Sequence, residues 1–303
     1  MDRSVGVNQT NQPSITRCVL LAVLAHPDDE SFGIGGTLAL YAQRDVQVHL
    51  VCATRGEAGE VSPEHLQGFT SVADLRVSEL RCAAGILGLS GVHFLDYRDS
   101  GMPGSSDNRH PQALAAAPPA EVAARVAHIM RLLRPQVVIT NDPIGGYKHP
   151  DHIAVHKATT AAFQLAGDPA FVDPDGLPPY QPQKLYYQTF PKGALRLAVR
   201  LLPLLGRDPR HFGRNGDIDI RALVEEGDFP IHARIDYRQV AEKRAAASAC
   251  HASQLDGGPP NRGLIGLVWR LFGDTEQFMR ACPPPEPGLH EKDLFAGVDC
   301  QRS

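Results

Sequence analysis

The chain lacks the features that nucleic-acid-binding and membrane proteins require. Its 303 residues contain 30 basic and 34 acidic side chains, a net charge of −4, so no excess of positive charge favours a polyanion. No uncharged run reaches the roughly 18 residues of a membrane span, and residues 1–17 contain no apolar signal core. We therefore predict a cytoplasmic protein with no nucleic-acid partner and no stable membrane insertion, and we leave a homo-oligomer open.

Cysteine is scarce and scattered along the chain. No two cysteines have the C-x-x-C spacing of a thiolate zinc site or of a redox motif. We therefore predict buried or idle thiols in a reducing compartment. The six cysteines are Cys18, Cys52, Cys82, Cys250, Cys282 and Cys300.

What is present, 43% hydrophobic and 21% charged residues, is the composition of a folded globular protein. Residues 18–25 form a continuous apolar run, which is typical of a strand buried on both faces of a parallel sheet. Further strands are predicted at 46–53, 92–95, 137–140 and 185–189, and helices at 35–44, 71–87, 120–133 and 151–165. Because strands alternate with helices, the sequence predicts a three-layer, Rossmann-like α/β fold with a mostly parallel sheet, complete at residue 189.

We divide the chain into an N-terminal extension at 1–17, a catalytic α/β core at 18–190 and a C-terminal elaboration at 191–303. The elaboration is rich in Pro, Gly and Arg, with a strand predicted at 231–235 and a helix at 237–253. It lacks the periodic patterns of an independent unit. We therefore expect it to belong to the same domain as the core and to shape the substrate pocket.

The densest polar cluster is His26-Pro27-Asp28-Asp29-Glu30, directly after the first predicted strand. Ligands of doubly wound sheets bind at the carboxyl ends of the strands. A solvated turn would explain a pair of aspartates, but it explains less well a histidine three residues before an acid. That spacing allows His26 and Asp29 to reach one cation.

A second cluster follows the fourth predicted strand and opens on the same edge of the sheet. It comprises residues 145–152 and contains Tyr147, His149 and His152. Catalytic zinc takes three protein ligands and keeps one position for water, and His26, Asp29 and His152 supply such a set. The alternative is two unrelated helix-capping turns. We predict a Zn²⁺ site, which Fe²⁺ could also occupy.

Together the two clusters resemble a known family. Ala25-His26-Pro27-Asp28-Asp29-Glu30 and His149-Pro150-Asp151-His152 are similar to the metal motifs of the zinc-dependent LmbE/PIG-L family of N-acetylglucosaminyl deacetylases. Residues 56–60 and 97–102 resemble segments of its mycothiol branch, and the likeness covers about 19–163. It implies a hydrolase that deacetylates a small GlcNAc glycoside, such as a thiol-cofactor precursor.

By position, the resemblance implies that His26, Asp29 and His152 bind the metal and that Asp28 is the general base. His149 would be the general acid or the electrostatic partner of the oxyanion.

The same resemblance places Tyr147 near the developing oxyanion, and Arg76 and Asp99 on the sugar. We expect Glu30 and Asp151 to hold and orient groups that touch the metal.

Amide hydrolysis explains why these residue types occur together. A metal ion lowers the pKa of its bound water from about 15.7 toward 7. Asp28 is adjacent to the ligand Asp29 but on the opposite side of an extended backbone, so it can accept the proton of that water. A donor such as Tyr147 or His149 then stabilises the oxyanion.

Two positions depart from the family pattern. Gly33 replaces a lysine of the amidase that cleaves mycothiol conjugates, which favours deacetylation, and Lys148 replaces a small residue. An amidase or deacetylase of a non-sugar N-acyl metabolite, and a non-catalytic sugar- or metal-binding module, remain the alternatives. His156 is a less favoured further ligand, and Glu57 is as easily solvated as bound to sugar hydroxyls.

Overall fold

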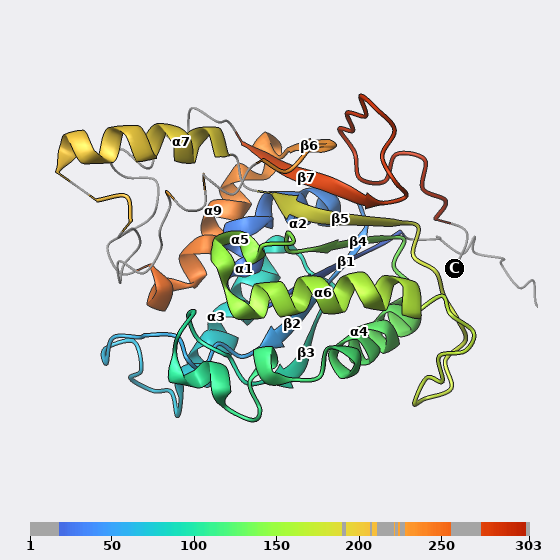
Figure 1. Cartoon of the computed structure of the whole chain (residues 1–303), viewed down its shortest axis with the longest axis horizontal. Helices are drawn as coiled ribbons and strands as arrows, with labels where there is room; N and C mark the ends of the chain where they lie inside the picture. Colours follow the sequence, from blue (N-terminus) through green and yellow to red (C-terminus); the bar gives the residue numbers. More distant parts are fainter. Residues whose placement is uncertain are drawn as a thin grey trace, which may run out of the picture.

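The computed structural model describes residues 18–189, 192–206, 208–210, 221, 224, 228–255 and 274–300. These residues form one seven-stranded sheet of order β3-β2-β1-β4-β5-β7-β6, with helices against both faces (Figure 1). The strands are β1 Val19–Leu24, β2 Gln47–Thr54, β3 Gly91–Tyr97, β4 Val137–Thr140, β5 Lys184–Thr189, β6 Ala233–Asp236 and β7 Thr275–Cys282. The predicted α/β fold is confirmed.

The helices follow the strands in the alternation that the sequence predicts. The α-helices are α1 Asp29–Gly33, α2 Gly35–Gln43, α3 Val72–Leu87, α4 Pro119–Leu133, α5 Gly145–Lys148, α6 Pro150–Leu165, α7 Lys192–Leu201 and α9 Ala241–Cys250. The 3₁₀ helices are η1 Ser106–Arg109, η2 Leu114–Ala116, η3 Leu202–Leu205, η4 Arg238–Val240 and η5 Ala252–Gln254. None of the helices within the described ranges is long and apolar enough to cross a membrane.

β1 is apolar at every position because both of its faces pack against helices. Leu20 and Leu24 belong to the core under α2, α3 and α9, whereas Leu21 and Val23 belong to the core under α4 and α6. All four side chains are fully buried. Two hydrophobic cores, one on each face of the sheet, therefore make the three layers.

The order of the strands places the reversal of winding direction between β1 and β4. β1 pairs in parallel with both β2 and β4, and the chain runs outward through β2 and β3 before it crosses to β4 and β5. Such a reversal of direction leaves room for a ligand at the carboxyl ends of the two central strands. The two polar clusters of the sequence follow these two strands.

The prediction that the core is complete at residue 189 is wrong. β7 pairs antiparallel with β5, and β6 pairs antiparallel with β7, so the segment after residue 190 extends the same sheet by two strands. Residues 275–282 were not predicted as a strand, because their sequence TEQFMRAC carries charged side chains without a regular alternation. The three-part domain division stays a prediction, and residues 1–17 lie outside the described residues.

The prediction of idle thiols is wrong for four of the six cysteines. Cys18 forms a disulfide with Cys300, and Cys82 on α3 forms one with Cys250 at the end of α9. Cys52 and Cys282 are free. Local spacing could not reveal these pairs, because their partners are 282 and 168 residues apart.

Candidate active site

The first motif leaves β1 in a tight turn that folds Asp29 back onto the end of the strand. Oδ2 of Asp29 accepts hydrogen bonds from the backbone N–H groups of His26 (2.9 Å) and Ala25 (3.2 Å). Asp28 adopts a left-handed backbone with φ 118°, which is unusual for a residue other than glycine. The turn therefore points the neighbouring Asp28 and Asp29 in different directions.

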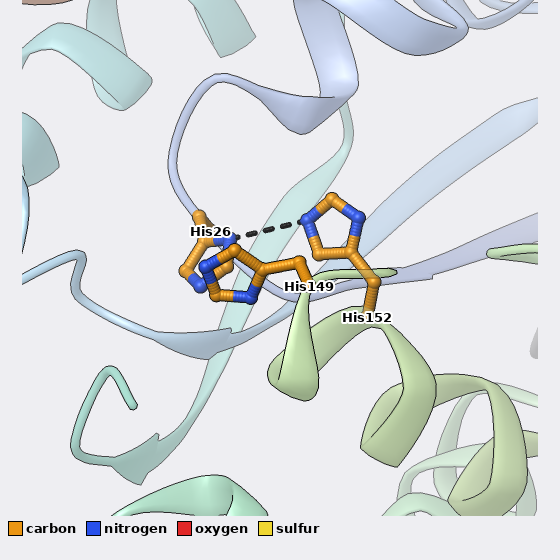
Figure 2. Close-up of side chains that lie close together, drawn as sticks. All are labelled: His26, His149 and His152. Atoms are coloured by element: carbon orange, nitrogen blue, oxygen red, sulfur yellow. Dashed lines mark hydrogen bonds between the residues drawn. The ribbon is translucent and has the colours of Figure 1, made fainter. Parts of the chain in front are cut away.

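Three potential ligand side chains, those of His26, Asp29 and His152, converge where this turn meets the start of α6. Nε2 of His152 lies 3.3 Å from Nδ1 of His26 and 3.3 Å from Oδ1 of Asp29. Oδ2 of Asp29 lies 3.7 Å from Nδ1 of His26. In a tetrahedral zinc site with bonds of about 2.0–2.1 Å, ligand atoms lie about 3.3 Å apart. The three side chains thus have the spacing that a small divalent cation requires, and Figure 2 shows the two imidazoles facing each other.

The other nitrogen of His26 faces two buried carboxylates. Nε2 lies 3.1 Å from Oδ2 of Asp151 and 3.5 Å from Oδ1 of Asp99. Burial by itself lowers the pKa of His26, but Asp99 and Asp151 outweigh it and hold that pKa well above its usual value. Because Nε2 faces a carboxylate, Nδ1 is the nitrogen that His26 can offer to a cation, and binding would displace the Nδ1 proton that the raised pKa otherwise retains.

Asp151 is held in turn by Ser100. The backbone N–H of Ser100 donates to Oδ2 of Asp151 (2.9 Å), and its hydroxyl donates to Oδ1. Asp151 is fully buried at the first turn of α6. Asp151 is thus fixed by Ser100 and in turn holds the ring of His26.

Asp28 lies against Arg76, which comes from α3. Nη2 of Arg76 donates to Oδ2 of Asp28 (2.9 Å) and to the carbonyl of Pro27 (2.6 Å). Burial raises the pKa of Asp28 to about 6, although Arg76 acts in the opposite direction. A carboxyl group with this pKa can take up and release a proton near neutral pH.

The glycines of the loop 56–60 make room for Arg76. A Cβ on Gly56 would lie 2.3 Å from Nη1 of Arg76, and one on Gly59 would lie 2.8 Å from it. Gly56 also has φ 72°, a left-handed backbone that favours glycine. The guanidinium is thus enclosed by this loop, and Arg76 is only 4% exposed.

Glu30 uses both of its oxygens inside the protein. Oε2 accepts from the backbone N–H of Asp28 (3.0 Å), and Oε1 accepts from the hydroxyl of Ser31 and from Nε2 of His251 (2.7 Å). Glu30 and His251 are both fully buried. Glu30 therefore holds the backbone of Asp28.

His149 and Tyr147 lie on the α6 side of the cluster. The His149 ring centroid is 4.6 Å from that of His26 and 5.1 Å from that of His152, and Figure 2 shows the three rings together. The Tyr147 ring centroid is 5.3 Å from that of His152. Burial, followed by Asp29 and Asp28, raises the pKa of Tyr147 well above its usual value, so its hydroxyl remains a hydrogen-bond donor.

The N-terminus of α6 fixes the tautomer of His149. Nδ1 of His149 accepts the backbone N–H of Asp151 (3.2 Å) as the N-cap of the helix. Burial, with His26 and His152, lowers the pKa of His149 to about 2, so the ring is neutral. A neutral ring that accepts at Nδ1 carries its proton at Nε2. In this tautomer His149 presents an N–H donor at Nε2, beside the other two histidines with which it could also surround a metal ion.

Asp99 follows β3 and borders the same cluster. Its Oδ1 accepts from the backbone N–H of Gly101 (2.8 Å), and its own N–H donates to Oε2 of Glu57 (3.1 Å). Glu57 is thus tied to this loop. His156 lies elsewhere, with Nδ1 2.9 Å from the carbonyl of Asn141.

Comparison with known proteins places the chain in a family. A family model described as PIG-L, GlcNAc-PI de-N-acetylase, matches residues 21–163. A Streptomyces scabiei protein named 1D-myo-inositol 2-acetamido-2-deoxy-alpha-D-glucopyranoside deacetylase is 37% identical over 295 residues, which cover 92% of this chain and 89% of the relative. The chain belongs to the PIG-L family. The family predicted from the two motifs is confirmed.

Solved structures resemble this PIG-L protein in fold. GalB, the 4-carboxy-2-hydroxymuconate hydratase of Pseudomonas putida KT2440, matches with a TM-score of 0.59 and 20% identity, covering 90% of this chain and 99% of that one. The N,N'-diacetylchitobiose deacetylase of Pyrococcus horikoshii matches with a TM-score of 0.58 and 22% identity, covering 86% and 83%. Because a hydratase and a deacetylase share this fold, the reaction must be argued from the side chains.

The structure brings all ten predicted site residues into one neighbourhood, but two of them face other protein groups. Arg76 faces Asp28 and the enclosing loop, and Asp99 faces His26, so sugar contacts by these two residues stay a prediction. His251 was missed, because it lies 221 residues from Glu30 in the elaboration and no local motif marks it.

Proposed function

We propose that the protein is a metal-dependent N-deacetylase of a small GlcNAc glycoside, such as a GlcNAc-inositol precursor of a thiol cofactor. The observation that carries this proposal is the convergence of Nδ1 of His26, Asp29 Oδ and Nε2 of His152 beside an acid, Asp28, that does not belong to the set. The relative from Streptomyces scabiei, with its printed substrate, supports the choice of glycoside.

Zn²⁺ is the proposed metal, with Fe²⁺ as the alternative that the same donors accept. Two imidazole nitrogens and one carboxylate at separations of 3.3–3.7 Å fit either ion. When bound, the metal supplies an acidic water and polarises the acyl carbonyl of the substrate. His26, Asp29 and His152 would hold it, and Asp151 keeps His26 in the tautomer that binding requires.

Asp28 is the proposed general base. Its carboxylate is fixed by Arg76 and its backbone by Glu30, so it cannot turn inward to become a fourth ligand without breaking these contacts. A base takes the proton of the attacking water, and the same group then returns a proton to the departing amine. The pKa of about 6 suits both steps near neutral pH.

His149 and Tyr147 are the proposed donors to the oxyanion. Each is neutral and carries one proton, His149 at Nε2 and Tyr147 at its hydroxyl. Preorganised donors of this kind contribute on the order of 100-fold or more to acyl transfer. Of the two predicted roles of His149, we favour the electrostatic partner, because Nδ1 accepts the N–H of Asp151 and leaves one proton, at Nε2, to face the oxyanion.

A substrate panel tests the proposal. Acetate release would be measured from N-acetylglucosaminyl glycosides, including the GlcNAc-inositol compound, and from N-acylated non-sugar metabolites. Preference for the glycosides supports the proposal, whereas turnover of the non-sugar amides alone favours the amidase alternative. No turnover of any acyl compound by metal-loaded protein would contradict enzymatic function and leave a binding module.

The cytoplasm remains our predicted location. The two disulfides count against it, because disulfides are rare in a reducing compartment. Thiol trapping in fractionated cells tests the location: free thiols at Cys82 and Cys250 in the cytoplasmic fraction agree with it, and oxidised cysteines in another fraction contradict it.

A further inference from the structure

A buried contact joins the C-terminal segment to the first motif. Nε2 of His251 lies 2.7 Å from Oε1 of Glu30, and both side chains are 0% exposed. His251 follows α9, whereas Glu30 is the second residue of α1. The proposed mechanism gives His251 no part, so this buried imidazole needs an explanation.

Glu30 transmits the position of His251 to the general base. Its second oxygen, Oε2, accepts the backbone N–H of Asp28. Asp28 has φ 118°, a strained backbone conformation that persists only where the surroundings hold it. The imidazole fixes one oxygen of Glu30, and the other oxygen fixes the strained peptide.

His251 is itself held in place by α3. Cys250, the preceding residue, is disulfide-bonded to Cys82, and Ser253 donates from both its N–H and its hydroxyl to Glu79 (2.8 and 2.7 Å). The ring also makes an edge contact with Phe32, with centroids 5.7 Å apart. The imidazole therefore has a fixed location relative to the first motif.

α3 also contacts Asp28 directly. It carries Arg76, which binds the carboxylate of Asp28. One helix thus fixes the side chain of the base through Arg76, and supports its backbone through His251 and Glu30.

We propose that His251 is a positioning residue that, through Glu30, holds the backbone of Asp28 in the conformation from which its carboxylate reaches the metal-activated water. The proposal rests on the proposed function of Asp28. It makes the segment after residue 190 part of the catalytic apparatus, because without it one oxygen of Glu30 loses its imidazole donor.

Two substitutions of similar polarity separate this role from general packing. His251→Gln keeps an N–H donor near the place of Nε2, whereas His251→Asn is too short to reach Glu30. We expect His251→Asn to lower kcat by about 10- to 100-fold, as loss of an outer contact at a metal site commonly does, with KM within about threefold and metal content unchanged. His251→Gln should keep kcat within about threefold of wild type.

Ser253→Ala is the matched control. It removes the hydroxyl contact with Glu79 but keeps the Ser253 N–H bond to Glu79 and the Cys82–Cys250 disulfide, which still hold the turn, and it does not touch Glu30. We therefore expect kcat to stay within about twofold. Equal kcat for His251→Asn and His251→Gln, or an equal loss in Ser253→Ala, overturns the proposal. If His251→Asn does not fold, His251→Gln decides: a loss of about 30-fold or more in folded protein contradicts the role.

Hydrogen exchange of the Asp28 amide gives a readout that does not depend on turnover. In full-length protein, the Asp28 amide should exchange at least about tenfold faster in His251→Asn than in His251→Gln, because Glu30, its acceptor, is no longer fixed in His251→Asn. Equal exchange in the two variants overturns the positioning role. Absence of acetate release by wild type, with the exchange difference present, would instead sink the proposed function and leave the positioning of Asp28 intact.

Discussion

Nη2 of Arg76 lies 2.9 Å from Oδ2 of Asp28, and both groups are enclosed beside the predicted metal ligands. This ion pair joins the middle of α3 to the turn after β1, 48 residues away. This contact, which the sequence did not reveal, holds the carboxylate of Asp28, our proposed general base, and lowers its pKa. Predictions about the base can therefore be tested at either partner.

Substitution of Asp28 should separate catalysis from metal binding. We expect Asp28→Asn to lower kcat by about 100- to 10,000-fold, the range typical of a lost general base, with the metal retained. His152→Ala should lose the metal as well, since it removes one of the three donors. Metal analysis and acetate release on the same samples check both; an Asp28→Asn protein purified without metal would contradict the assignment of roles.

The acid limb of kcat/KM should report Asp28. Its pKa is raised to about 6, chiefly by burial, and Arg76 lowers it. Only the ionised carboxylate acts as a base, so activity should be lost as pH falls through a midpoint near or below 6, since a bound cation lowers the pKa further. Arg76→Met removes a positive charge and should move this midpoint upward. An unmoved midpoint together with a raised KM would favour the sugar contact instead.

His149 offers a test in which stability and activity separate. Asn at this position keeps an N-cap acceptor for Asp151 but has no Nε2–H, whereas Ala has neither. Both variants should lose about 100-fold in kcat, as an oxyanion donor would. Only His149→Ala should lose about 1 kcal/mol of unfolding free energy. Denaturant unfolding and steady-state kinetics measure the two effects, and full activity of His149→Asn would exclude the donor role.

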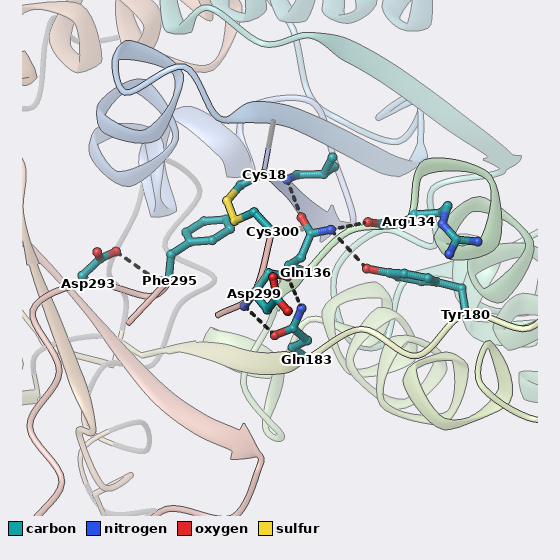
Figure 3. Close-up of a disulfide and its surroundings, with 10 residues drawn as sticks. Cys18, Arg134, Gln136, Tyr180, Gln183, Asp293, Phe295, Asp299 and Cys300 are labelled. Carbon is teal, nitrogen blue, oxygen red and sulfur yellow. Dashed lines mark hydrogen bonds between the residues drawn. A yellow bond between two sulfur atoms is a disulfide. The ribbon is translucent and has the colours of Figure 1, made fainter. Parts of the chain in front are cut away.

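The disulfide between Cys18 and Cys300 links the start of β1 to the C-terminal end, and Figure 3 shows it beside Gln136. Oε1 of Gln136 accepts the backbone N–H of Val19 (2.7 Å), a contact at this end of the sheet that does not depend on either cysteine side chain. Cys18→Ala/Cys300→Ala should lower the unfolding free energy by about 2–4 kcal/mol and leave kcat unchanged. Cys282→Ser, which changes a free cysteine, is the control. Equal unfolding curves for the double variant and the Cys282→Ser control would argue against the disulfide.

Local patterns in the sequence predict most of the strands and helices of the core. A strand buried on both faces is apolar at each position, as residues 19–24 are, and the two polar clusters follow strands that topology places side by side. Both motifs are short in sequence, so the candidate metal ligands could be predicted from the sequence alone. The fold class and the predicted ligand cluster follow from information within about ten residues of each position.

What could not be predicted depends on long-range contacts. β7 is recognisable only once β5 and β6 provide its partners. The imidazole of His251 and the cysteine pairs act across 168 to 282 residues, and no local spacing encodes such distances. Arg76 was predicted to hold the sugar, which stays a prediction, and its contact with Asp28 appears only when α3 is packed against the sheet.

The most direct test of the account is a crystal structure of zinc-loaded protein with anomalous scattering recorded at the zinc edge. We expect one strong peak about 2.0–2.2 Å from Nδ1 of His26, a carboxylate oxygen of Asp29 and Nε2 of His152, with Asp28 still paired with Arg76 and outside the coordination sphere. A peak bound by Nε2 of His149 in place of Asp29, or by Asp28 itself, would contradict the account.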